Sequence, residues 1–125
     1  MSMPIAQLAF KLDGSGLVWH PEIGDEIADR NDLDLVSILV DPHGLTPSEL
    51  RKMFLWLPTV EQLVEQFEAR QAIIYHAGLN EKFQYEAVIH SASGVIEATA
   101  VTLRIAFASA LLNILAVSHQ RKDLH

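Results

Sequence analysis

The segment "VIEATAVTLRIAFASALLNILAVSHQ", residues 95–120, decides the fold class that we predict for this chain. Its polar positions form only a narrow stripe on a helical wheel, so that apolar side chains occupy most of the circumference. We therefore predict one helix of about 25 residues that begins after Gly94 and is buried on more than one side. Its apolar centre, Ile105–Val117, is too short for a membrane span, which needs about 20 residues.

Upstream of this segment, two short helices and a hairpin are predicted. Two threonines are followed three residues later by a side chain that can complete a capping box: Thr46 by Glu49, and Thr59 by Gln62. The first helix should end before Pro58, because the residue before a proline is disfavoured in the α region. The second presents one apolar stripe, formed by Val60, Leu63, Val64 and Phe67.

Strands are expected on both sides of these helices. Residues 72–77 and 83–91 flank "GLNE" and predict a β-hairpin. Residues 5–12 alternate in hydropathy and predict a half-buried strand, with 17–19 as the strand that returns after the turn "DGSG". The apolar run 35–40 predicts a buried strand.

The stretch between them, 25–34, is polar and should be irregular, with one helical turn around Ile27. Together these segments predict one α+β domain over residues 1–125. It combines antiparallel β-hairpins, two short capped helices and one long apolar C-terminal helix.

Residues 57–115 also resemble a known group of proteins. The segments that carry the resemblance are "WLPTVEQL" (56–63) and "EATAVTLRIAFASALL" (97–112). They are similar to the opening helix, and to the Glu-Ala-x-Ala-x-Thr start and Ala-Ala-Leu finish of the closing helix, in small phage-encoded modules described as ABA sandwiches. The resemblance implies the order helix, hairpin, helix. It implies no activity and no site residues.

Composition narrows the possible functions. The chain has 125 residues, a net charge of −7, only 9 lysines and arginines, and no cysteine. This charge disfavours nucleic acid and anionic membranes, and the lack of cysteine excludes disulfides and thiolate chemistry. The first residues do not have the pattern of a secretory signal, so we expect a cytoplasmic protein. A hydrophobic fraction of 50% favours an additional apolar face, such as a subunit interface.

The richest cluster of chemical groups is "GLVWHPEIGDEIADRNDLD", residues 16–34. A metal site here would use His20 and Glu22 with Asp25 or Asp29, yet no second histidine lies at zinc-ligand spacing. Residues 29–34 do not match an EF-hand loop, which needs glycine at its sixth position and glutamate at its twelfth. The preferred interpretation is a solvated acidic connection with Trp19 packed in the core. We predict no metal site.

Elsewhere, the ionisable side chains favour structural roles. In the predicted hairpin, His76 should face Tyr85, and His90 should lie beside residue 71 or 72, too far away to share a metal ion with His76. Arg104 should be partly buried beside Glu97. No nucleophile or phosphate-binding motif occurs, so we predict no catalytic residue and no cofactor.

Two hypotheses of different classes follow. The preferred one is a non-catalytic interaction or accessory protein that acts as a homo-oligomer through small residues of the long helix. The predicted interface residues are Thr102, Ala106, Ser109, Ala110 and Asn113. The alternative is a small-molecule-binding or hydrolytic protein with one pocket shared by the acidic stretch and the hairpin. Its wall would comprise Trp19, His20, Glu22, Tyr75, His76 and Tyr85.

Overall fold

The computed structural model describes residues 4–123, and the side chains of residues 4–117. Within that range the chain forms four helices and two three-stranded antiparallel sheets, which confirms the predicted α+β class. The first half contains α1 (Ile5–Gly14), β1 (Glu26–Asp29), β2 (Asp32–Ile38), α2 (Pro47–Met53) and β3 (Phe54–Trp56). The second half contains α3 (Val60–Ala69), β4 (Ile73–Leu79), β5 (Tyr85–Ser91), β6 (Gly94–Ala100) and α4 (Leu103–Asp123).

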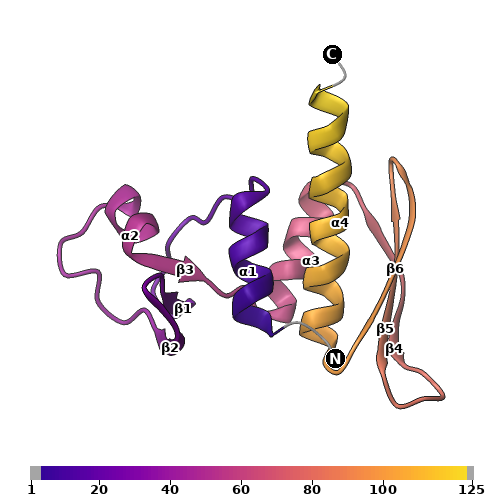
Figure 1. Cartoon of the computed structure of the whole chain (residues 1–125), viewed down its shortest axis with the longest axis horizontal. Helices are drawn as coiled ribbons and strands as arrows, with labels where there is room; N and C mark the ends of the chain where they lie inside the picture. Colours follow the sequence, from indigo (N-terminus) through magenta and orange to yellow (C-terminus); the bar gives the residue numbers. More distant parts are fainter. Residues whose placement is uncertain (1–3, 124–125) are drawn as a thin grey trace.

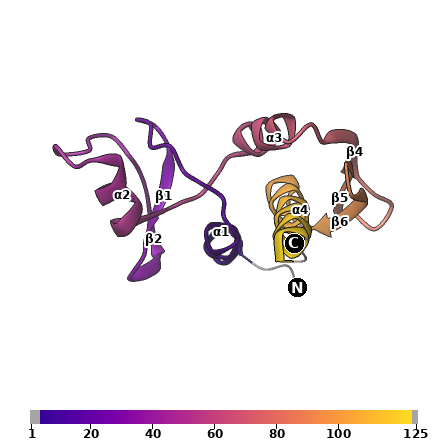
Figure 2. The same cartoon turned by 90° about the horizontal axis from the view of Figure 1, so that it is seen from above.

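The two sheets lie at opposite ends of the molecule, with helices between them (Figures 1 and 2). Sheet A has the strand order β2-β1-β3, and sheet B has the order β4-β5-β6. α4 packs against α1, α3 and the inner face of sheet B. The largest apolar core forms at this junction, where the rings of Phe67 and Phe107 meet edge to face with centroids 5.7 Å apart. These three neighbours explain why α4 is apolar around most of its circumference.

The predicted long helix is wrong over its first turns. Residues 94–100 form strand β6, and α4 begins only at Leu103. The side chains of β6 alternate: Ala98 and Ala100 are buried, whereas Val95 and Thr99 are exposed. The small inward residues are alanines, which have high helix propensity, and they obscured the two-residue period of a strand. The hydroxyl of Thr102 accepts a hydrogen bond from Ile105 N at 3.1 Å, within the first turn of the helix.

The N-terminal strand was also a wrong prediction, because residues 5–12 lie in helix α1. Ile5, Leu8, Ala9 and Leu12 have helical spacing, and the last three are buried. The alternation in the same residues fits a strand equally well, and packing between α4 on one side and sheet A on the other selects the helix. Residues 17–19 are not part of a strand. Trp19 nevertheless packs in the core as predicted.

Residues 25–34, expected to be irregular with a helical turn, instead contribute β1 and the start of β2 to a hairpin. Residues 35–40 contain most of β2, as predicted for a strand, but they are mostly exposed and not buried. β2 is an edge strand, paired antiparallel with β1. An edge position with little covering structure leaves side chains on both faces of the strand in solvent.

The starts of the two capped helices and the presence of the hairpin were predicted correctly, but α2 ends at Met53 and the strand β3 that follows it was not predicted. The Thr46 hydroxyl accepts from Glu49 N at 3.1 Å, and the Glu49 carboxylate accepts from Thr46 N at 3.2 Å. Thr59 and Gln62 repeat this capping box at the start of α3. β4 and β5 form the predicted hairpin.

No helix in the described part of the chain combines the length and hydropathy needed to cross a bilayer.

Candidate functional site

The strongest candidate for a functional surface is an exposed apolar strip on sheet A. It comprises Val36 and Ile38 on one face of β2, Leu35 on the other face and Val40 just beyond the strand, and we call these residues the β2 strip. These four side chains are between 49% and 75% exposed. Several exposed apolar side chains on one edge strand indicate a candidate site of interaction.

The hydrogen bonding of sheet A fixes the strip in place. Val36 lies opposite Ala28 of β1, and Ile38 lies opposite Glu26. The ladder continues past the strand, where Leu39 N donates to Asp25 O at 2.8 Å and Leu39 O accepts from Gly24 N at 2.7 Å. Leu39 itself is buried. The strip is therefore anchored from one side while its apolar side chains face solvent.

A small apolar hollow adjoins the end of β2. It has a volume of about 230 Å³. Its walls come from Ile38 to Val40 on one side and from Leu45, Leu50, Met53 and Phe54 on the other. A hollow of this size accommodates one or two aliphatic side chains and is too small for a drug-sized molecule.

Carboxylates flank the β2 strip. Asp32 and Asp34 lie in the first half of β2, and Asp41 follows Val40; all three are exposed. The Asp32 carboxylate accepts from Asp34 N, and the Asp41 carboxylate accepts from His43 N, so each bonds to the backbone two residues later. Within the described residues, none of the three forms an ion pair with a lysine or arginine. The strip is thus apolar along its centre and negative at its ends.

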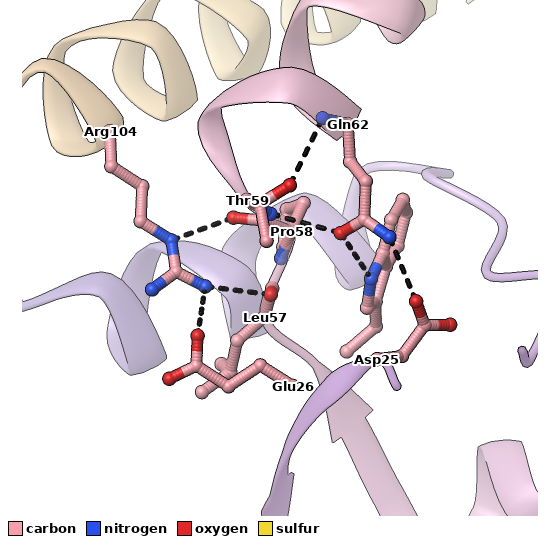
Figure 3. Close-up of polar contacts among 8 residues, drawn as sticks. Asp25, Glu26, Leu57, Pro58, Thr59, Gln62 and Arg104 are labelled. Carbon is pink, nitrogen blue, oxygen red and sulfur yellow. Dashed lines mark hydrogen bonds and ion pairs between the residues drawn. The ribbon is translucent and has the colours of Figure 1, made fainter. Parts of the chain in front are cut away.

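The acidic stretch contains one buried carboxylate, Asp25, which departs from the predicted solvated connection. It is only 6% exposed and accepts hydrogen bonds from Trp19 Nε1 at 2.9 Å and Glu22 N at 2.9 Å. Its second oxygen accepts from Gln62 Nε2 at 2.8 Å (Figure 3). Gln62 thus ties Asp25 to the start of α3. These three donors satisfy the carboxylate, which indicates a structural role.

Arg104 does not pair with Glu97, and that prediction is wrong. Its guanidinium reaches Glu26 of β1 at 2.7 Å and donates to the carbonyl oxygens of Leu57 and Pro58, each at 2.7 Å (Figure 3). The predicted continuous helix placed Glu97 on the same face as Arg104, seven residues earlier, but Glu97 lies on strand β6. Arg104 therefore fastens sheet A and the start of α3 to α4.

The candidate pocket residues do not gather at one place. Trp19 is buried, while His20 and Glu22 border a recess of about 180 Å³ near Asp25 and Gln62. Tyr75, His76 and Tyr85 belong to β4 and β5. These strands are at the other end of the molecule (Figure 2). The two halves of the predicted wall are thus separated by the helical layer.

On sheet B the histidines are closer than predicted. His76 lies opposite Val88 and not Tyr85, because the loop spans residues 80–84 and Tyr85 pairs with Leu79. His90, two residues after Val88, lies opposite Ile73. Its ring stacks on Tyr75, with centroids 4.7 Å apart and planes 8° apart. No group of three or more histidine or acidic side chains in the described residues is arranged to hold a metal ion.

The predicted interface stripe on α4 is partly buried inside the chain. Ala106 and Ala110 are 0% exposed, and Ser109 is half-buried. Thr102 and Asn113 remain exposed. Because α1, α3 and sheet B all pack on α4, the small residues allow close approach within one chain. The two alanines therefore cannot contact a second copy.

Compared with known proteins, the chain gives no significant match to a protein-family model, a curated protein or a solved structure. The resemblance of residues 57–115 to ABA sandwich modules accordingly stays a prediction.

Proposed function

We propose that this chain is a non-catalytic interaction protein that acts as a homo-oligomer. The observation that carries the proposal is that each sheet leaves apolar side chains uncovered at its own end of the molecule. A domain that needed only to be stable would gain free energy by covering them. Retained apolar surface is typical of proteins that bind other proteins.

The outer face of sheet B is the part of this surface best suited to self-association. Ile73, Tyr75 and Val95 are 60–71% exposed at one end of that face. The Tyr75–His90 stack lies in the same region. Glu86 and Glu97 belong to later rows of the face, beyond this apolar end. Two copies related by a twofold axis can therefore join these apolar ends without opposing acidic groups.

Light scattering on the full chain tests the oligomer. We expect a dimer mass at about 100 μM, a concentration that favours even a small interface with micromolar affinity. Tyr75→Lys and Val95→Lys should each give a monomer, because each places a charge in the contact. Val40→Lys, on the β2 strip, is the matched control and should stay dimeric. A monomer mass for the unmodified chain would reject self-association.

The small-molecule alternative has weaker support. The recess beside His20 and Glu22 is below the usual range for ligand sites, which begins at about 300 Å³. Its buried carboxylate, Asp25, already accepts three hydrogen bonds from the protein. Little polar capacity is left there to orient a substrate.

A further inference from the structure

We infer that the β2 strip binds an extended segment of a different protein, which adds to sheet A as a fourth strand. The segment would carry apolar side chains at alternate positions and lysine or arginine beside them. This inference rests on the proposed interaction function and names the partner chemistry at one of its two surfaces.

The backbone of β2 provides the first reason. β2 ends the strand order of sheet A, with β1 as its neighbour. The free edge of such a strand offers a row of N–H and C=O groups to an incoming chain, and peptide-binding domains use this mode of addition. Proteins usually protect edge strands with lysine, proline or a bulge. Residues 35–40 contain no lysine or proline, and the register irregularity of the hairpin lies beside Ala28 and Asp29, at its turn.

The side chains of the strip provide the second reason. Val36, Ile38 and Val40 alternate along the chain, so an added strand could set its own apolar residues next to them. The hollow between the end of β2 and α2 is lined by Leu39 and Leu50 on the other face of sheet A, and it provides space for an aliphatic residue of the added strand that points to that face. Backbone hydrogen bonds would supply affinity, and the hollow would supply selectivity for an aliphatic group.

Charge decides between a foreign segment and a second copy. Asp32, Asp34 and Asp41 flank the strip without lysine or arginine partners in the described part of the chain. Of the nearby arginines, Arg30 pairs with Asp13, and Arg51 points to Trp19, where its guanidinium donates to the backbone carbonyl oxygen. A second copy would bring three more carboxylates to the same place, and the whole chain has a net charge of −7. A basic partner complements this surface, and a second copy repels it.

Fluorescence anisotropy with the full-length chain tests the inference on synthetic peptides. All peptides share an alternating threonine and valine or isoleucine core. One is flanked by lysines and one by glutamates. Two further lysine-flanked peptides carry N-methyl groups on one or the other set of alternate residues, which removes the backbone donors of one edge.

We expect the lysine-flanked peptide to bind at least about tenfold more tightly than the glutamate-flanked one at low salt. The difference should shrink in 0.5 M salt because the charges are exposed. One of the two N-methylated peptides should lose binding, whereas the other keeps it. The inference would be overturned by equal affinities for the lysine-flanked and the glutamate-flanked peptide, or by N-methylated peptides that both bind as tightly as the unmethylated one.

Variants locate the binding. The double variant Asp32→Asn/Asp34→Asn keeps the acceptor oxygens but removes both charges. It should weaken binding of the lysine-flanked peptide about fivefold, which is the usual effect of losing two exposed ion pairs. The double variant Ile38→Thr/Val40→Thr should weaken binding of the lysine-flanked and the glutamate-flanked peptide by the same factor, because threonine keeps strand propensity but removes apolar contact. Val95→Thr on sheet B is the matched control. An unchanged affinity in both β2 variants would overturn the inference.

The same data separate this inference from the proposed homo-oligomer. A dimer that binds none of the peptides contradicts the β2 inference alone. A monomer that binds the lysine-flanked peptide contradicts the homo-oligomer alone. If Val40→Lys dissociates the dimer, a second copy occupies the strip and the inference of a foreign partner is wrong.

Discussion

Sheet A and sheet B have the same number of strands and the same antiparallel pairing, yet they are buried very differently. The inner face of sheet B, which includes Ala87 and Ile89, belongs to the large core around α4. Sheet A divides its apolar residues between two small clusters, one on each face. Its edge strand β2 belongs to neither except through Leu33. A sheet whose core is this small can leave a strand available for binding, at the cost of local stability.

The largest expected effect concerns the core on the sheet B side. Ala110→Glu should lower the free energy of unfolding by about 4 kcal/mol or more, because it buries an unpaired charge at a 0% exposed position. Urea unfolding followed by circular dichroism measures the change. Asn113→Glu, on an exposed position of the same helix, should change stability by less than about 0.5 kcal/mol. Similar losses for both variants would contradict the burial of Ala110.

A smaller effect is expected where the two sheets are joined. Arg104→Met removes the donor to the Leu57 and Pro58 carbonyl oxygens and the partner of Glu26. We expect the free energy of unfolding to fall by about 2 kcal/mol, a value within the usual range for hydrogen bonds to a charged group. Urea unfolding of Arg104→Met, Glu26→Gln and the double variant forms a double-mutant cycle. Strictly additive losses would mean that the Arg104–Glu26 pair contributes no coupling.

The smallest effects concern the two capping boxes, at the starts of α2 and α3. Thr46→Ala and Thr59→Ala should each lower the free energy of unfolding by about 0.5 to 2 kcal/mol. Thr59→Ala should have the larger effect, because α3 packs in the main core and its Gln62 also binds Asp25. Thermal unfolding compares them, with the exposed Ser48→Ala as the control that should be neutral. A larger loss from Thr46→Ala would reverse the stability order that we assign to the two regions.

The local sequence determined the features whose hydrogen bonds close within a few residues. Each capping box joins positions three apart, so threonine with glutamate or glutamine is enough to predict where α2 and α3 begin. The β4–β5 hairpin followed from two strand-like runs around a short polar turn. The carboxylates that flank the β2 strip were also visible in the sequence, although their position beside exposed apolar side chains was not.

Only the tertiary structure decided the segments whose pattern fits two periods. Residues 5–12 fit a helix or a strand, and packing on α4 selected the helix. Residues 94–100 also fit either structure, and pairing with β5 selected the strand. The exposure of β2 was equally undetermined, because an apolar run does not reveal whether another element will cover it. Ala106 and Ala110 look the same whether they meet a neighbouring helix or a second chain. Local propensities differ by less than about 1 kcal/mol per residue, so long-range burial decides such cases.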